Sequence, residues 1–389
     1  MLSFTIALGL RALILLSSVT PGAPSPTAQS SEYLESRSNV LPLTVNTIYE
    51  PTVPTWHENL AVRANGQLLV TRLDAPILEL IDPAATNTTP IIINNFGSAY
   101  TGCLGITELG SDVFYVVAAA PFGSDFVKTS GNSSVFKVNM NTFATDSNGD
   151  VMGGATITKV ADLPTAGFLN GMTTLNVNAG LVVIADSLNG TVYTLNVNTG
   201  SYKVTIDDAK MKALSTAITP LGINGVKIRN GYLYFSNTGN PIFSRIPISP
   251  TTGCATGSSS VVASVLQTDD FVFRADGTAW MSQNQIQSES VVKNGVTTLV
   301  AGNNYSTTLA GVTAGQFGRS IATANILYLT TNGGKWKIFP AVDQRRVFRL
   351  ISLQVLPYLS MAQLSCLARL HTLIPAISHK NISGGRIKC

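Results

Sequence analysis

The chain has 389 residues, of which 45% are hydrophobic and 12% are charged, so it has enough apolar material for a large core. The formal net charge is +4, but apart from a cluster at 335–349 the Lys and Arg residues are scattered and form no basic stripe interleaved with aromatic residues. We therefore expect no nucleic-acid partner. The length suggests two or three domains, although all-β folds of this size often form a single one.

The N-terminal segment is typical of a secretory signal. An apolar run is followed by small and Pro-rich residues suited to cleavage, and we expect residues 1–28 to be a signal peptide. Arg11 interrupts the apolar run, which argues against a membrane-spanning helix. We therefore expect a secreted protein. Five Asn-x-Ser/Thr sequons fit this route and are candidate glycosylation sites: Asn87, Asn132, Asn189, Asn304 and Asn381.

The cysteines and histidines form no metal-binding motif. In an oxidising compartment Cys103 and Cys254 could pair. No Cys-x-x-Cys or Cys/His spacing predicts zinc, and the three histidines lie far apart, at His57, His371 and His379.

From residue 42 to 334 the pattern is almost entirely that of β-structure. Short strands rich in Val, Ile, Leu, Tyr and Phe alternate with Gly, Asn, Asp and Thr turns, and long helical periodicity is absent. Groups of strands recur at a spacing typical of propeller blades. The first inner strand of each group is expected to start near Glu58, Leu104, Leu169, Gly222, Asp269 and Gly318. Because one sheet cannot bury both faces alone, the pattern predicts an all-β fold, a six-bladed β-propeller.

The two ends of this region are expected to differ. Residues 42–51 are predicted to add a strand to the last blade and close the ring. Residues 335–389 are Leu-rich, lack turn residues and have a marginal helical pattern broken by Pro357 and Pro375. We expect a divergent C-terminal tail, with a helix packed on the propeller as the alternative. Its uncharged run carries Gln, Ser and Pro, so no stable membrane span is expected.

Four polar residues fall at the predicted starts of inner strands in four blades: Glu58, Asn170, Asn224 and Asp270. Inner strands of a propeller line a central channel, so these side chains are expected to converge on one axis. Two acids and two amides are oxygen donors suited to Ca²⁺ or Mg²⁺. A Gly follows each Asn and would let the backbone approach a ligand. Asn-Gly is also a common turn dipeptide, so a turn is the alternative, but repetition in register favours a site.

These positions resemble the metal ligands of the gluconolactonase/regucalcin family of six-bladed propellers, where a Glu, two Asn and an Asp hold one divalent ion. The stretch "VIADSLNGTVYTLNVNTG" is also similar to strictosidine synthase-like propellers of that superfamily. More specifically, residues 45–334, roughly three quarters of the chain, resemble secreted fungal proteins of the superfamily through "ENLAVR", "LGI", "DVFYVV", "LNGM", "ADS", "GINGVK", "LYFSNT", "DDF" and "FGR". Some of these are hetero-Diels–Alderases of tropolone-sesquiterpenoid (meroterpenoid) biosynthesis.

The resemblance implies a pericyclase. A hydroxymethyl tropolone would lose water to give a quinone methide, which would add across a double bond of a macrocyclic sesquiterpene such as humulene, with no cofactor required. The acid that helps hydroxide leave would be His57 or Glu58, since burial raises the pKa of a carboxyl. The remaining candidates are donors to the tropolone oxygens and apolar walls for the hydrocarbon: Asn170, Asn224 and Lys227 as donors, and Trp56, Tyr100, Phe168 and Phe271 as walls.

Two other classes of function are alternatives. A metal-dependent lactonase or esterase would bind its ion at the four polar positions and use Asp269 or Asp270 as a base. Asn59-Leu60-Ala61 follows the Glu where lactonases have Ser-Pro, which weighs against hydrolysis. A secreted binding propeller without catalysis would use the rim residues only to satisfy one another's hydrogen bonds.

Several other polar residues are given structural interpretations. Asp186-Ser187 is expected to cap a turn rather than to form a nucleophile pair, since no G-x-S-x-G elbow is present. Asn237 and Gln283 are expected near the channel in structural roles. Arg319 either closes the rim by pairing with an acid or has no role there.

Overall fold

The structure is a computed structural model, and it describes residues 41–85, 88–120, 132–146, 149–334 and 349–355. The expected signal peptide and most of the expected tail lie outside these residues, as do Asn87, Asn381 and the histidines at 371 and 379. All of the described residues belong to one unit that begins at Leu41. Within the described ranges, the one helical element is the 3-10 turn η1 (Ala209–Met211), and none of their helices has the length and hydropathy to cross a membrane.

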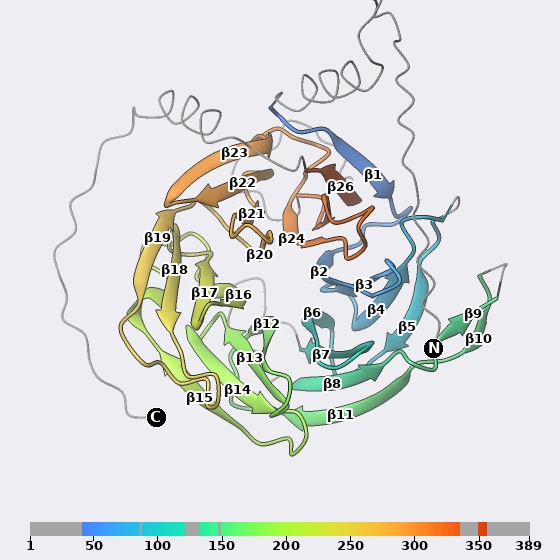
Figure 1. Ribbon diagram of the computed structural model, residues 1–389, viewed down its shortest axis with the longest axis horizontal. Helices are drawn as coiled ribbons and strands as arrows, with labels where there is room; N and C mark the ends of the chain where they lie inside the picture. Colours follow the sequence, from blue (N-terminus) through green and yellow to red (C-terminus); the bar gives the residue numbers. More distant parts are fainter. Residues whose placement is uncertain (1–40, 86–87, 121–131, 147–148, 335–348, 356–389) are drawn as a thin grey trace, which may run out of the picture. The chain divides into compact units, whose positions relative to one another are not determined.

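Six antiparallel sheets of four strands stand around a central axis as blades (Figure 1). The innermost strands of blades 1 to 6 are β2 (His57–Val62), β6 (Gly102–Glu108), β12 (Leu169–Asn176), β16 (Ile223–Arg229), β20 (Phe271–Phe273) and β24 (Val312–Phe317). The second strands are β3 (Leu68–Arg72), β7 (Val113–Ala119), β13 (Leu181–Asp186), β17 (Tyr232–Asn237), β21 (Ala279–Gln283) and β25 (Ile326–Thr331). The third strands are β4 (Ile77–Ile81), β8 (Ser133–Asn139), β14 (Thr191–Asn196), β18 (Ile242–Pro247), β22 (Ser288–Lys293) and β26 (Leu350–Gln354). The outermost strands are β5 (Ile91–Asn95), β11 (Thr156–Asp162), β15 (Tyr202–Asp207), β19 (Ser260–Ser264), β23 (Val296–Gly302) and β1 (Val45–Tyr49). A hairpin of β9 (Ala144–Thr145) and β10 (Val151–Gly153) projects from blade 2. The predicted six-bladed propeller is confirmed.

The sixth blade joins the two ends of the propeller. β1 pairs with β26 in the sheet order β1-β26-β25-β24, which confirms that residues 42–51 add a strand to the last blade. Because β26 lies beyond residue 334, the propeller extends into the segment that the sequence pattern assigns to the tail. The predicted start of the sixth inner strand near Gly318 is wrong. That strand is "VTAGQF", which ends at Phe317, and its Gly and Gln weaken the apolar pattern.

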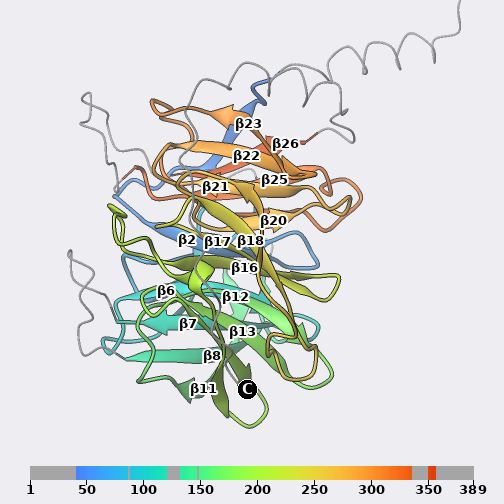
Figure 2. The ribbon, with the colours of Figure 1, turned by 90° about the vertical axis from the view of Figure 1, so that its left-hand side faces the viewer.

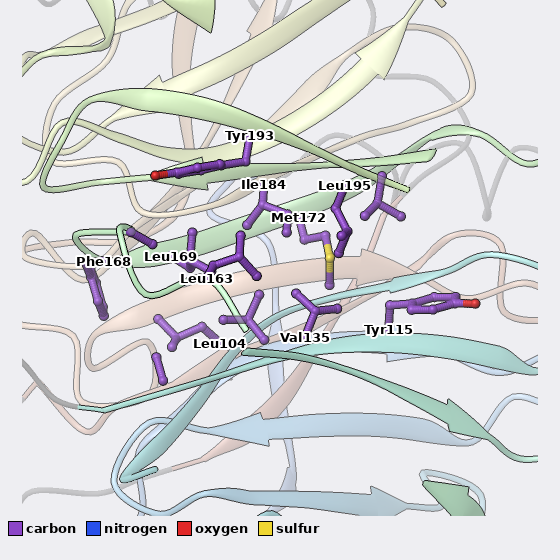
Figure 3. Close-up of a cluster of buried hydrophobic side chains, with 14 of the residues drawn as sticks. Leu104, Tyr115, Val135, Leu163, Phe168, Leu169, Met172, Ile184, Tyr193 and Leu195 are labelled. Carbon is purple, nitrogen blue, oxygen red and sulfur yellow. The ribbon is translucent and has the colours of Figure 1, made fainter. Parts of the chain in front are cut away.

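The apolar core is divided among the interfaces between blades. Six clusters of buried side chains each join two neighbouring blades. Figure 3 shows the cluster between blades 2 and 3, and Figure 2 shows the sheets lying one against the next. Adjacent residues of one strand face different blades: Leu68 packs toward blade 6 and Leu69 toward blade 2. Burial of both faces explains why these strands are apolar runs rather than alternating patterns.

Cys103 and Cys254, which could have paired, form no disulfide with each other. Cys103 is a free, fully buried thiol on β6 and packs between blades 1 and 2. Cys254 follows β18 in blade 4. Cys103 therefore acts as a small apolar side chain, and burial raises the pKa of its thiol.

Candidate functional site

Three of the four residues expected at the channel lie in β-bulges. The register of the innermost strand shifts against the second strand in five of the six blades, and β20 of blade 5 is the exception. Glu58, Asn170 and Asn224 occupy these shifts in β2, β12 and β16. A bulge leaves an extra residue unpaired and re-aims its side chain, which is how a polar residue at a strand start comes to face the channel.

A hydroxyl group from the second strand supports the bulge in three blades. In blade 1 the amide N–H of Asn59 donates to Thr71 Oγ1 at 3.0 Å. In blade 4 the amide of Gly225 donates to Ser236 Oγ at 2.8 Å. In blade 6 the amide of Ala314 donates to the hydroxyl of Thr330 at 3.2 Å. These bonds satisfy backbone groups that the irregular ladder leaves without a strand partner.

The two Asn-Gly pairs are not turns, because both lie inside strands. A Cβ built on Gly171 would lie 2.5 Å from the carbonyl oxygen of Asn224, and one on Gly225 would collide with the carboxylate of Asp270. Glycine is therefore required for the close approach of one inner strand to the next. The backbone approaches the neighbouring blade, and not a ligand as the sequence suggested.

The bulges open onto a pocket at one end of the central channel. Its volume is about 430 Å³ with the open mouth included. The lining residues are Trp56, Glu58, Leu73, Phe168, Asn170, Thr219, Leu221, Asn224, Thr238, Asp269, Asn284 and Gln285. Polar side chains of blades 1, 3, 4 and 5 thus meet beside apolar side chains, which is the usual composition of a small-molecule site.

Glu58 is a buried acid of this pocket. It is 5% exposed, and its Oε2 accepts the indole N–H of Trp56 at 2.5 Å. Burial raises the pKa of Glu58 to about 7, the Trp56 hydrogen bond opposes this shift, and the charge of Asp270 adds to it. A carboxyl with this pKa can serve as a general acid at physiological pH.

Asp269 is the second acid of the pocket. Asn224 Nδ2 donates to its Oδ1 at 2.7 Å, and Asn284 Nδ2 donates to its Oδ2 at 3.0 Å. Burial, together with the charges of Glu58 and Asp270, raises the pKa of Asp269 well above its usual range. Asn224 also donates to Thr238 Oγ1 at 3.0 Å, so both of its amide protons are used and it acts by holding Asp269.

Asn170 contrasts with Asn224. Its side chain is 3% exposed and lines the pocket, and it makes no hydrogen bond within the described part of the chain. A buried amide without a partner is costly, so this group is suited to bind a ligand.

Two predicted site residues, Asp270 and Lys227, lie away from the pocket. The structure puts Asp269, not Asp270, on the pocket lining. The side chain of Asp270 accepts from Asn59 and Lys227 on the other side. β20 begins only at Phe271 and has no bulge. The residue of blade 5 that faces the pocket is therefore Asp269, one position earlier than predicted.

Three further predicted residues are buried in the blades. His57 is fully buried with its Nε2 3.4 Å from Glu79 Oε2. Tyr100 shares a hydrogen bond of 2.9 Å with Ser134 Oγ. Phe271 is fully buried in the cluster between blades 4 and 5. None of these three side chains lines the pocket.

The other polar residues discussed from the sequence make structural contacts. Asp186 accepts the amides of Gly167 and Phe168 and the amide nitrogen of Asn189, as a turn cap does. Asn237 donates to two backbone carbonyls. Gln283 donates to a third carbonyl, that of Leu266. Arg319 pairs with Glu108 at 2.6 Å, at the opposite end of the channel.

Sequence reasoning missed several lining residues, notably Thr219, Asn284 and Gln285. Asn284 and Gln285 follow β21 in the run "SQNQIQSES", which is unusually polar for a chain of this composition and almost wholly buried. Gln285 Nε2 donates to Thr219 Oγ1 at 2.7 Å and so links blade 5 to the loop before β16. This long run of polar residues was the feature of the sequence from which these lining residues could have been predicted.

The donor set of the pocket fits a hard divalent cation in its chemistry. The donors are the carboxylates of Glu58 and Asp269 and the side-chain oxygens of Asn170 and Asn224. A cation between the two acids would also stabilise their charged forms and so oppose the burial that raises their pKa values. Among the described residues, no three or more His, Cys, Asp or Glu side chains are grouped to hold a metal, so the amides would be needed.

Two curated proteins are similar to most of the chain, while no protein-family model matches it. "Putative hetero-Diels-Alderase" from Phoma sp is 26% identical over 322 residues, covering 76% of this chain and 88% of that protein. "Putative hetero-Diels-Alderase asR5" from Sarocladium schorii is 25% identical over 307 residues, covering 71% and 75%.

Solved structures share the fold. A luciferin-regenerating enzyme matches with a TM-score of 0.56 and 12% identity, over 81% of this chain and 96% of its own. The calcium-binding protein regucalcin from Agrobacterium tumefaciens matches with a TM-score of 0.51 and 15% identity, over 82% and 97%. The chain is thus a six-bladed β-propeller like these structures, and its similarity to two proteins with the hetero-Diels-Alderase name supports a pericyclase-like enzyme.

Proposed function

We propose that the chain is a hetero-Diels–Alderase that joins a tropolone-derived quinone methide to a double bond of a macrocyclic sesquiterpene such as humulene, in fungal meroterpenoid biosynthesis. The observation that carries this proposal is the buried carboxyl of Glu58, which lies beside apolar walls in the channel pocket and whose pKa burial raises to about 7. The similarity to two proteins with this name supports it.

Glu58 supplies the proton for the first step. Its carboxyl donates to the hydroxymethyl oxygen of the tropolone, the carbon–oxygen bond breaks, and water leaves. The ring hydroxyl then returns a proton to Glu58, so the products are a neutral quinone methide and water. Trp56 stabilises the transient carboxylate through its indole N–H.

The amide of Asn170 is free to hold a tropolone oxygen. Asn224 and Asn284 fix Asp269 in place, and Asn224 is thereby a positioning residue. Because these groups are held before the substrate arrives, they need no reorganisation during the reaction.

The second step is the cycloaddition. Four electrons of the conjugated C=C–C=O unit and two of the alkene form one carbon–carbon and one carbon–oxygen bond, with no atom lost and no cofactor required. The apolar side chains of Trp56, Phe168 and Leu221 would contact the hydrocarbon. The protein contributes mainly by holding the two reactants in line.

Incubation of the purified protein with a hydroxymethyl tropolone and humulene tests the proposal. We expect faster adduct formation and a different isomer ratio than in buffer, and loss of both in Glu58→Gln. Glu289→Gln is the matched control, since Glu289 is also a fully buried acid with a raised pKa but lies outside the pocket lining. A rate and isomer ratio equal to those in buffer would refute the proposal.

A metal-dependent lactonase or esterase is the second candidate, favoured by the donor set of two carboxylates and two amides. The pocket would hold the ion through Glu58, Asp269, Asn170 and Asn224, and the ion would polarise a carbonyl. Lactone hydrolysis that is lost on chelation and restored by Ca²⁺ would establish this function instead.

Entry into the secretory pathway is part of the proposal. Asn132, Asn189 and Asn304 are exposed. The amide of Asn189 donates to Asp186, so glycans are expected at Asn132 and Asn304 first. A mass decrease of the secreted protein after enzymatic deglycosylation tests this expectation.

A further inference from the structure

The central channel has a second hollow at its other end. The ends of the inner strands line it, with Val62, Glu108, Thr173, Lys227, Phe317 and Arg319 among the lining residues. The volume of this hollow is about 640 Å³ with its open mouth included, compared with about 430 Å³ for the pocket that contains Glu58. The far hollow is therefore the larger of the two spaces.

A polar bridge crosses the channel between the two spaces. Asp270 of blade 5 accepts Asn59 Nδ2 of blade 1 at 2.9 Å. It also accepts Lys227 Nζ of blade 4 at 2.8 and 3.0 Å, on its two carboxylate oxygens. Blades 1 and 4 lie on opposite sides of the ring, as the positions of β2 and β16 show (Figure 1). The three side chains therefore span the channel from one wall to the other.

The members of the bridge adjoin either the pocket or the far hollow. Asn59 directly follows Glu58, and Asp270 directly follows Asp269, so two bridge residues adjoin the acids of the pocket. Lys227 lines the far hollow. The bridge therefore lies between the pocket and the hollow.

The bridge is also closely packed. Asn59 is 5% exposed and Asp270 4%. The amide of Phe271 donates to Asp270 Oδ1 at 2.7 Å, and Lys227 Nζ lies 5.4 Å from the Phe271 ring centroid. Gly225 leaves room for the carboxylate, since any Cβ there would overlap it. Packing of this kind holds the carboxylate in one position.

We propose that Asn59, Asp270 and Lys227 form a partition that keeps water of the far hollow away from the reaction pocket. This inference rests on the proposed function, because a quinone methide is the species that needs such protection. Water adds to its exocyclic methylene carbon: a carbon–oxygen bond forms, the electrons of the C=C bond move into the ring, and a proton ends on the ring oxygen. The product is the starting alcohol, so each leak reverses the dehydration.

Lys227→Ala in ¹⁸O-labelled water tests the partition. We expect several-fold faster ¹⁸O incorporation into the recovered hydroxymethyl alcohol and a lower fraction of cycloadduct than in the native protein. Gln316→Ala is the matched control, since Gln316 lines the same hollow but takes no part in the bridge, and it should behave as the native protein does. A folded Lys227→Ala with native label incorporation and native adduct fraction overturns the inference.

Two further variants separate exclusion of water from simple support of the fold. In Lys227→Met with Asp270→Leu an apolar pair replaces the ion pair, and native label incorporation is expected because the channel is again filled. Asn59→Ala removes one of the hydrogen bonds to Asp270 and leaves its ion pair with Lys227 intact. This variant replaces Lys227→Ala in the test if an unpaired Asp270 prevents folding. It should raise label incorporation, and a folded Asn59→Ala without that rise overturns the inference in the same way.

Failure of the proposed function would look different. A native protein that forms no adduct refutes the cycloaddition but leaves the partition testable by structure. A crystal structure of Lys227→Ala, or of Asn59→Ala in its place, is expected to show ordered water that joins the hollow to the pocket. A channel that stays closed in that variant overturns the partition.

Discussion

The indole N–H of Trp56 donates a 2.5 Å hydrogen bond to Oε2 of Glu58, and both side chains line the same pocket. The bond stabilises the carboxylate, while burial disfavours it more strongly, and the balance puts the pKa of Glu58 at about 7. The pocket therefore holds an acid whose protonation changes near physiological pH.

This pKa predicts the pH dependence of catalysis. If the protonated form of Glu58 is the catalyst, kcat/KM falls as the pH rises above about 7. Glu58→Gln should lose about 10²- to 10⁴-fold in rate below pH 7, and this loss relative to the native protein should become smaller as the pH rises above about 7. Trp56→Phe removes the hydrogen-bond donor that stabilises the carboxylate, so it should raise the pKa of Glu58 and shift the fall in kcat/KM to higher pH. A native profile that is flat from pH 6 to pH 9 contradicts this role.

The same group predicts a pH-dependent stability. The folded pKa of Glu58, about 7, exceeds its usual value of 4.5, so the folded state binds more protons than the unfolded state between these values. Its contribution to the free energy of unfolding is therefore fully present below pH 4.5 and is lost as the pH rises through 7. The loss is at most about 3 kcal/mol. Denaturant titrations at pH 4 and pH 8 should show that Glu58→Gln becomes more stable relative to the native protein at the higher pH. A difference in the free energy of unfolding between the two proteins that does not change with pH would count against the burial of this charge.

The two asparagines predict different mutational effects. Asn170 makes no hydrogen bond within the described ranges, so Asn170→Ala should lower kcat/KM by about ten- to a hundredfold and leave the melting temperature nearly unchanged. Asn224 donates to Asp269 and Thr238, so Asn224→Ala should lower both activity and melting temperature. Kinetics and thermal unfolding of the two variants check this contrast. Equal losses of stability would show that Asn170 has a structural partner.

Gly171 predicts a steric effect on the site. A Cβ there would lie 2.5 Å from the Asn224 carbonyl oxygen, so Gly171→Ala should destabilise the protein by about 1–3 kcal/mol and displace Asn224. Gly154→Ala is the matched control, because nothing lies within 4 Å of a Cβ at that position. Urea unfolding of both variants tests the effect, and similar midpoints for the two would show that the blades can separate at little cost.

Chelation separates the two candidate chemistries. The proposed cycloaddition has no step that depends on a metal, so adduct formation should be unchanged by EDTA. Ca²⁺ bound between Glu58 and Asp269 would raise the melting temperature and release protons, because both acids would ionise. Isothermal titration with Ca²⁺ in two buffers of different ionisation enthalpy measures that release. Loss of adduct formation on chelation would show that an ion takes part.

The blade repeat could be predicted from the sequence because inner strands such as β2, β3 and β13 are buried on two faces and the turns are rich in Gly, Asn and Asp. Glu58, Asn170 and Asn224 were found for the same reason, since they stand at equivalent positions of the repeat. The sequence pattern predicted Asp270 in the pocket, whereas Asp269 lines it. The difference arises because β20 is the one inner strand without a bulge, so the residue that faces the pocket is displaced by one position. No local pattern reveals this shift, because it is set by packing against neighbouring blades.

Contacts between residues that are far apart in the sequence could not be predicted either. The ion pair of Asp270 with Lys227 joins residues 43 positions apart, and the bond from Asn59 to Asp270 joins residues 211 apart. Asn284 was missed because it follows a second strand rather than beginning an inner one. Such residues can be identified only from the three-dimensional contacts between blades.

The bulges supported by hydroxyl groups have a consequence for divergence and design. In blades 1, 4 and 6 a Thr or Ser of the same blade accepts a hydrogen bond from the irregular backbone, so this backbone contact does not depend on which side chain occupies the bulge. Evolution or a combinatorial library can therefore exchange the channel side chains one blade at a time. One scaffold could then acquire unrelated chemistries through a few substitutions at the bulge positions, without any change in the strands that carry them.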